Sequence, residues 1–235
     1  AANHPTGFQF TKGQHPCFAY AKAIRDTGAK VLIGVNGGFQ DPQELDAYIA
    51  AGDCDLIAMA RGLFADEDYM EKCLTGRGED IVPCIWCNKC HGTMTPPWIS
   101  FCSVNPRLGI DPMLLKTLPA GGTKKKVAIV GGGPIGMRAA IMAAEQGHQV
   151  TLFEKTDYLG GQLRHSDYVS FKWPLRDYKD YLVRQLSKHG VTVRLNTLAT
   201  PELLRQELGE DETGCVRVVH RLDRPVGGVM VYARS

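Results

Sequence analysis

The sequence has no long hydrophobic run and no secretion signal. No stretch of its 235 residues approaches the roughly 18 apolar residues that a membrane-spanning helix needs. The N-terminus lacks the basic, apolar and small-residue regions of a signal peptide. Net charge is low as well, since 27 Lys and Arg residues stand against 25 Asp and Glu residues. Nothing here argues for RNA or a membrane as a partner, and we expect a cytoplasmic protein that acts on a small molecule.

The chain is short for the folds that it suggests. A content of 44% hydrophobic residues with 26 glycines is typical of a globular protein with one or two cores. A complete (β/α)8 barrel takes about 250 residues, so a whole barrel and a second domain cannot both be present. The sequence also starts at Ala1 rather than at Met. We expect a fragment of a longer parent protein.

The first half of the chain alternates predicted helices and strands. The apolar runs 30–35 and 55–60 are nearly continuous, which predicts strands buried on both faces of a parallel sheet. Helices are predicted over 14–28, 41–52 and 66–74, the second of them opened by an Asp-Pro-x-Glu cap. This order is typical of parallel strands joined by crossover helices.

A second α/β unit is predicted from residue 127 onward. Strands at 127–130 and 149–153 flank a helix at 134–146, which makes a β-α-β unit. A further helix at 175–189 and a strand at 191–195 continue the pattern.

Four of the eight cysteines lie within 19 residues, and they are Cys84, Cys87, Cys90 and Cys102. Closely spaced thiolates can converge on one centre because a short loop can wrap a metal or cluster. Disulfides are not expected, since the sequence otherwise has the character of an intracellular α/β protein. An iron–sulfur cluster, structural zinc and unligated thiols remain open from spacing alone.

A glycine-rich turn follows the first strand of the second unit. Gly131, Gly133 and Gly136 form a G-x-G-x-x-G pattern that opens a helix, and Glu154 ends the next strand. In this arrangement backbone N–H groups approach a pyrophosphate, and the carboxylate accepts a hydrogen bond from a ribose hydroxyl. An acidic residue favours FAD, ADP or NAD over a 2′-phosphorylated nucleotide. The alternative is a glycine turn without a ligand.

Two loops follow the two strands of the first half. Gly37 and Gly38 lie in one, and Arg61 lies in the other. In a β/α barrel the loops after the last two strands often bind phosphate through backbone N–H groups, with a cation adding charge. The alternative is a pair of plain turns with Arg61 in solvent.

In combination these motifs resemble a family. Residues 31–38 and 54–66, the cysteine segment with Ser103-Val-Asn-Pro106, and residues 127–136 are similar to NADH:flavin oxidoreductases of the 2,4-dienoyl-CoA reductase/trimethylamine dehydrogenase type. The resemblance covers about residues 12–205. One departure is that only two residues separate Cys87 from Cys90, where the family usually has three.

The resemblance implies a 4Fe–4S cluster between FMN in a barrel and FAD, or its ADP moiety, in a second domain. Electrons would pass from NAD(P)H through FAD, the cluster and FMN to an activated C=C bond. The family's catalytic residues would precede residue 1, and the parent could be a homo-oligomer. The implied roles are cluster ligation by Cys84, Cys87, Cys90 and Cys102, FMN phosphate binding by Gly37, Gly38 and Arg61, and FAD binding by Gly131, Gly133, Gly136, Glu154, Gly160, Gly161 and Gln162.

The C-terminal residues 216–234 carry a different resemblance. Their H-R-L-D-R segment is similar to that of ribosomal-large-subunit-type pseudouridine synthases, and Asp223 occupies the place of the nucleophile. The alternative is an ordinary β-hairpin with surface arginines. If both resemblances hold, the chain is a junction of two genes.

These inferences divide the chain as follows: the last βα units of a (β/α)8 barrel at 1–75, an iron–sulfur loop at 76–107, a linker at 108–125, an incomplete Rossmann-like FAD/NAD(P)-binding domain at 126–208, and a tail of uncertain kinship at 209–235. The rival interpretations are a zinc-stabilised nucleotide-binding module without redox activity and a chimeric chain with a synthase remnant. Two barrel strands with unpaired edges also predict poor stability of the chain alone.

Overall fold

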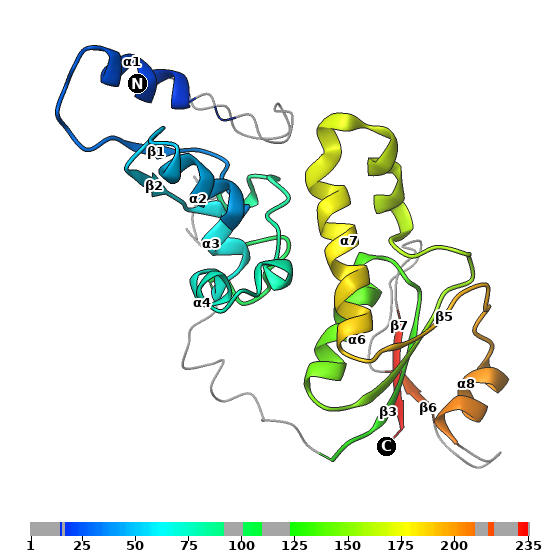
Figure 1. The fold of residues 1–235 in the computed structure, drawn as a ribbon. Helices are drawn as coiled ribbons and strands as arrows, with labels where there is room; N and C mark the ends of the chain where they lie inside the picture. Colours follow the sequence, from blue (N-terminus) through cyan, green and yellow to red (C-terminus); the bar gives the residue numbers. More distant parts are fainter. Residues whose placement is uncertain are drawn as a thin grey trace. The chain divides into compact units, whose positions relative to one another are not determined.

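A computed structural model describes His15 and residues 17–91, 101–109, 123–209, 216–218 and 230–234 (Figure 1). The chain divides into two compact units. The first contains residues 1–115 and 169–178, and the second contains residues 116–168 and 179–235. Within the described residues, no helix has both the length and the apolar character to cross a membrane.

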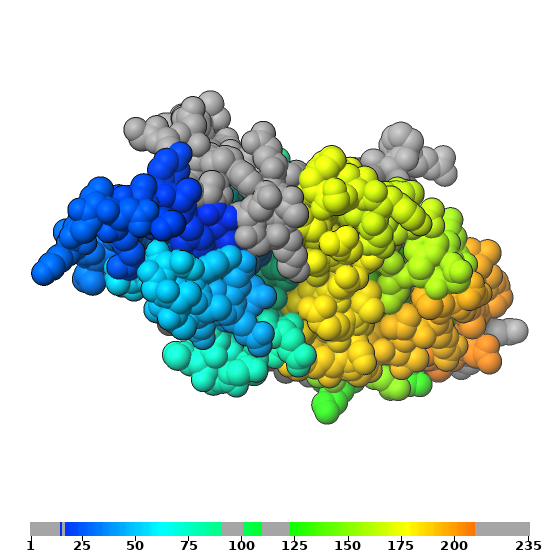
Figure 2. All heavy atoms as spheres, turned by 45° about the horizontal axis from the view of Figure 1, so that its top comes forward, coloured from blue at the N-terminus to red at the C-terminus, as the bar shows by residue number. Residues whose placement is uncertain are grey.

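The first unit is built on two short parallel strands, β1 and β2, with Gly34 opposite Leu56. Helices α1 and α2 lie on its surface in the blue part of Figure 2. Its elements are α1 (Cys17–Asp26), β1 (Gly34–Asn36), α2 (Pro42–Ala50), β2 (Leu56–Ala58), α3 (Arg61–Ala65), α4 (Tyr69–Leu74) and the 3-10 turns Gly78–Asp80 and Lys89–His91.

The prediction that these strands are buried on both faces is wrong. Ile33 and Val35 are buried in a cluster with residues of α1 and α2, but Leu32 is 78% exposed and Leu56 is 58% exposed. The reason is that the two helices cover one face of a sheet to which the described residues contribute two strands. Apolar residues that alternate with the buried ones therefore remain in solvent.

The helix predicted at 66–74 begins later than predicted, and a separate short helix precedes it. Residues Arg61–Ala65 form α3, which the sequence pattern did not predict, and α4 begins only at Tyr69. Asp66 between them has an extended backbone, and its buried carboxylate accepts hydrogen bonds from the N–H groups of Asp68 and Val82. Lys72 Nζ lies 2.7 Å from the same carboxylate and balances its charge. The break thus exists because a buried aspartate joins two segments.

The second unit is built on a five-stranded sheet with the order β5-β4-β3-β7-β6 (Figure 1). β3, β4 and β5 are parallel, as predicted for a β-α-β unit, whereas β7 runs antiparallel to β3 and pairs with β6. Its elements are β3 (Lys126–Val130), α6 (Pro134–Glu145), β4 (Gln149–Phe153), the 3-10 segment Gly161–Tyr168, β5 (Thr192–Arg194), α8 (Pro201–Leu208), β6 (Val216–Val218) and β7 (Met230–Arg234). The 3-10 turn Ser170–Lys172 and the first residues of α7 (Trp173–Lys188) belong to the first unit, and α7 from Lys179 onward belongs to the second.

Helix α8 was not predicted, and it covers one face of this sheet. Leu204 and Leu208 pack against Ala128 of β3 and Phe153 of β4. Thr200 caps the helix by accepting a hydrogen bond from Leu203 N–H. The tail strands belong to the same sheet, and Asp223 lies outside the described residues.

Candidate functional site

The loops that follow β1 and β2 line one cavity of about 260 Å³ in the first unit. Gly37 and Gly38 from one loop and Arg61 from the other meet there, so the three residues predicted to bind a phosphate are brought together. Gly37 has a φ of 122° and Gly38 a φ of 72°, values that favour glycine. The carboxyl ends of parallel strands are where such sites form.

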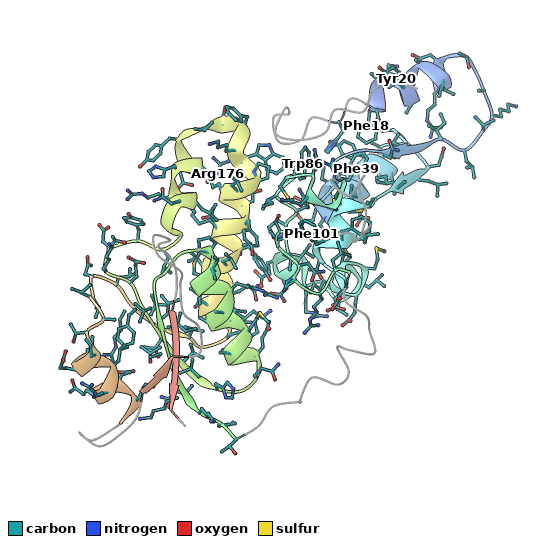
Figure 3. All side chains as sticks on the ribbon, turned by 180° about the vertical axis from the view of Figure 1, so that it is seen from behind. Phe18, Tyr20, Phe39, Trp86, Phe101 and Arg176 are labelled. Atoms are coloured by element: carbon teal, nitrogen blue, oxygen red, sulfur yellow. The ribbon has the colours of Figure 1, made fainter. Side chains whose placement is uncertain are left out.

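Trp86, which the sequence motifs did not predict, also lines this cavity; its side chain is labelled in Figure 3. Its indole is only 4% exposed, and a Cβ atom placed on Gly38 would lie 2.7 Å from the ring. The guanidinium carbon of Arg61 lies 5.2 Å from the ring centroid. A large apolar residue between two closely spaced cysteines was the signal that could have revealed it. Gly38 is therefore needed for the close approach of Trp86 as well as for the turn.

Gln40 joins the cysteine segment to the loop after β1. Its side-chain amide donates to the carbonyl of Cys84 at 3.0 Å, and its amide oxygen accepts from Cys84 N–H at 2.7 Å. The backbone carbonyl of Gln40 in turn accepts from the hydroxyl of Tyr69 at 2.8 Å. We call these two side-chain hydrogen bonds the Gln40 clamp. They hold Cys84 beside the loop that contains Gly37 and Gly38, which we call the phosphate loop.

Replacement of Gln40 by Glu is expected to loosen this clamp. A carboxylate can still accept from Cys84 N–H, but it cannot donate to the Cys84 carbonyl. We expect a loss of about 1–3 kcal/mol in the free energy of unfolding, with the Cys84 amide still protected from hydrogen exchange by its remaining bond. Gln40→Met, which removes both bonds without adding charge, is the comparison. Gln40→Met should also exchange the Cys84 amide faster, and unchanged exchange at Cys84 in Gln40→Met would show that the clamp is not formed.

The four clustered cysteines lie in two segments that contact each other and also contact α3, through Arg61 and Phe64. Cys87 Sγ lies 3.2 Å from Ser103 Oγ, beside Cys102. Asn105 donates to the carbonyl of Phe64 in α3 at 3.0 Å and holds the Cys102 segment in place. The described cysteines form no disulfide with one another. Within the described part of the chain, no three His, Cys, Asp or Glu side chains are arranged to hold a single metal ion.

The thiol of Cys84 is the most protected of the set. Burial raises its pKa to about 12, against the lowering effect of the Trp86 N–H and the Arg61 charge. Burial also raises the pKa of Cys90, and a nearby Cys102 adds to the rise. Without a metal, these thiols are therefore protonated at neutral pH, and any metal that binds must displace their protons.

The glycine turn of the second unit is formed as predicted between β3 and α6. Gly131 has a φ of 105°, and Gly133 precedes α6 without any side-chain cap on the helix N-terminus. Gly160 N–H donates to the carbonyl of Gly132 at 2.8 Å, and a Cβ atom on Gly161 would lie 3.2 Å from Gly133 Cα. Gly160 and Gly161, the second glycine pair, thus pack directly on Gly132 and Gly133 of the glycine turn. Gln162 is exposed, and Gly136 is buried in α6.

Glu154 lies where β4 ends, with its carboxylate at the glycine turn. Oε2 accepts from Gly132 N–H at 2.7 Å, and Oε1 accepts from the N–H and the hydroxyl of Thr156, both at 2.9 Å. Burial alone would raise the pKa of this carboxyl, but the three donors together hold the pKa below its usual range. A carboxylate offers about four acceptor positions, so one remains on Oε2 for a ribose hydroxyl.

Glu154→Gln is expected to destabilise the second unit in a pH-dependent manner. The glutamine cannot accept from both Gly132 and Thr156, which costs about 1–3 kcal/mol near neutral pH. A lowered folded-state pKa gives stability that is fully present above the unfolded pKa of about 4.3 and is lost as pH falls through the folded value. The gap between wild type and Glu154→Gln should therefore shrink as the pH falls below the unfolded pKa of about 4.3. Urea titrations across this range would test it, and a constant gap would contradict it.

A cavity of about 330 Å³ under α8 is lined in part by polar side chains that pair with one another. Arg194 pairs with Glu207 at 2.8 Å, and Thr151 donates to the same carboxylate at 2.7 Å. These groups hold α8 on the sheet, and they give no indication of a ligand.

Residues 126–179 match the family model described as FAD dependent oxidoreductase. This match and the relatives described next support an oxidoreductase. The chain is 40% identical over 178 residues, 74% of its length, to an NADH oxidase of Thermoanaerobacter brockii, of which it covers 26%. It is 32% identical over 234 residues, 97% of its length, to a bilirubin reductase of Mediterraneibacter gnavus, of which it covers 36%. A solved 2-naphthoyl-CoA reductase complex superposes on 86% of the chain with a TM-score of 0.73 and 30% identity, and the chain covers 30% of it.

The chain thus spans between a quarter and about a third of these proteins. The similarity to the bilirubin reductase runs through nearly the whole chain, and none of these matches supports a pseudouridine synthase segment.

Proposed function

We propose that this chain carries the cofactor-binding segments of an NAD(P)H-dependent iron–sulfur flavoprotein that reduces an activated C=C bond. In this proposal electrons pass from NAD(P)H by way of FAD and a 4Fe–4S cluster to FMN. The observation that carries it is the junction in the first unit, where the Gln40 clamp joins the cysteine segment to the phosphate loop.

The first unit carries the types of residue that the phosphate of FMN and a cluster need. Arg61 supplies positive charge at the cavity, and the glycine loop supplies a close backbone approach. Four thiols form a soft donor set that suits iron–sulfur clusters or zinc. Cys84 is buried, which would shield a centre bound there from water.

The second unit fits the ADP moiety of FAD. The first N–H groups of α6 have no side-chain cap, and such groups at a helix N-terminus bind pyrophosphate. The spare acceptor position on Glu154 would take a ribose hydroxyl, which favours an adenosine without a 2′-phosphate.

The names of the relatives support the direction of the chemistry. An NADH oxidase suggests a nicotinamide donor, and the bilirubin and 2-naphthoyl-CoA reductases suggest conjugated acceptors. We therefore propose a conjugated small molecule as the substrate class.

Anaerobic expression followed by iron, zinc and acid-labile sulfide analysis tests the proposal. We expect iron and sulfide in equal amounts with a broad visible absorption, together with bound flavin. One zinc per chain without sulfide would overturn the cluster and favour the zinc-stabilised nucleotide-binding module instead. Flavin without iron, sulfide or zinc would also overturn the cluster.

A further inference from the structure

Arg61 is held by residues of the cysteine loop, which we define as Cys84–Cys90. Its Nη1 donates to Asn88 Oδ1 at 2.8 Å, and its guanidinium lies over the Trp86 ring at 5.2 Å. These two neighbours lie on either side of Cys87 in the sequence. The cation at the cavity therefore takes its position from the loop that carries the cysteines.

The cysteine loop adopts an unusual backbone in order to present these groups. Trp86 has a φ of 54° and Asn88 a φ of 57°, the left-handed region that asparagine tolerates and that bulky residues rarely adopt. The Trp86 ring is fixed against Gly38 and makes an edge contact with Trp173 at 5.2 Å. The Trp86 N–H donates to Cys84 Sγ at 3.4 Å. A conformation that is disfavoured locally persists because these surrounding contacts hold it.

The groups that hold Arg61 are neutral, so they do not compensate its positive charge. Within the described residues no carboxylate forms an ion pair with Arg61. Asn88 takes one of the five N–H donors of the guanidinium and leaves the positive charge uncompensated. A guanidinium that is oriented in this way by an amide and an aromatic ring can donate hydrogen bonds to a doubly charged oxyanion such as a phosphate.

We propose that Asn88 and Trp86 are positioning residues that orient Arg61 toward the flavin phosphate, so that the cysteine loop sets the preference for FMN over riboflavin. This inference rests on the proposed FMN site. Its distinctive consequence is that a change at Asn88 alters recognition of the phosphate and leaves recognition of the ring system unchanged.

The test is titration of the 235-residue chain with FMN and with riboflavin, followed by quenching of flavin fluorescence. Asn88→Gly keeps the left-handed backbone and removes the acceptor, and we expect FMN affinity to fall about three- to tenfold with riboflavin affinity unchanged. Asn196→Gly is the matched control, because Asn196 also has a left-handed backbone (φ 51°) and lies in the other unit. Asn88→Asp keeps the acceptor, but its carboxylate competes with the phosphate for Arg61, and it too should weaken FMN binding alone.

The variant Arg61→Gln separates positioning from a general structural role. If Asn88 acts through Arg61, adding Asn88→Gly to Arg61→Gln causes no further loss of FMN affinity. Parallel loss of FMN and riboflavin, or a further loss in the double variant, would overturn the inference. Full retention of FMN preference in both Asn88 variants would also overturn it while leaving the FMN site intact. No preference for FMN over riboflavin in the wild type would overturn the proposed site itself.

Discussion

Cys84→Ala is expected to reduce iron and acid-labile sulfide after anaerobic reconstitution from about four of each per chain to background. The reason is that Cys84 is the innermost of the four thiols and the one that Gln40 holds at both its N–H and its carbonyl. In the proposed cluster, removal of this sulfur would leave an iron without a ligand at the position where the fold holds the segment at two points. Iron and sulfide analysis, with the visible spectrum recorded on the same sample, is the measurement.

Cys73→Ala is the matched control for this experiment. Burial raises the pKa of the Cys73 thiol, as it does for Cys84, but Cys73 lies in α4 outside the cysteine segment. We expect this variant to load iron and sulfide to the wild-type level. Full loading of Cys84→Ala would show that the other cysteines suffice, and equal loss in both variants would indicate a folding defect instead.

In the proposed cluster site, the protonation of the Cys84 thiol means that metal loading would have to release its proton. A buried thiol with a pKa of about 12 does not ionise by itself near neutral pH, so the bound metal has to supply the stabilisation of the thiolate. The N–H of Trp86 and the charge of Arg61 already lower the pKa of Cys84 from the higher value that burial would otherwise impose. Trp86 and Arg61 therefore interact with Cys84 and also line the cavity of the phosphate loop.

The β-α-β unit could be predicted closely because its signals are local. The apolar run at 127–130, the glycines of the turn and the apolar strand at 149–153 each fall within one element, and the structure places β3, α6 and β4 within one residue of the prediction. Glu154 could be predicted for the same reason, since its distance from the turn is set by the length of the helix and of the next strand.

The remaining features depend on contacts between distant residues, which no local pattern records. Gln40 and Cys84 are 44 residues apart, and nothing near either of them indicates the clamp. The exposure of Leu32 follows from how many strands surround it, whereas its apolar run predicted only a strand. Trp86 was overlooked because its role depends on Gly38 and Arg61, which come from two other loops.

Gly161→Ala is expected to weaken binding of FAD and of ADP about tenfold or more, because it separates two loops that must be in contact. Gly161 has a φ of 51°, and its added Cβ would lie 3.2 Å from the Cα of Gly133, which is backbone and cannot rotate away. Relief of this contact moves Gly133 and hence the first N–H groups of α6. Isothermal titration calorimetry with FAD and with ADP measures the effect on the shared part of the ligand.

Gly190→Ala separates this contact from the cost of the backbone conformation. Gly190 has a φ of 68°, but nothing lies within 4 Å of a Cβ atom at that position. Both variants should lose about 1–2 kcal/mol of stability from the left-handed conformation. Only Gly161→Ala should lose nucleotide affinity, because only there does the methyl group press on the turn that meets the pyrophosphate. Equal affinities in the two variants would mean that the packing of the second glycine pair on the first does not shape the nucleotide site.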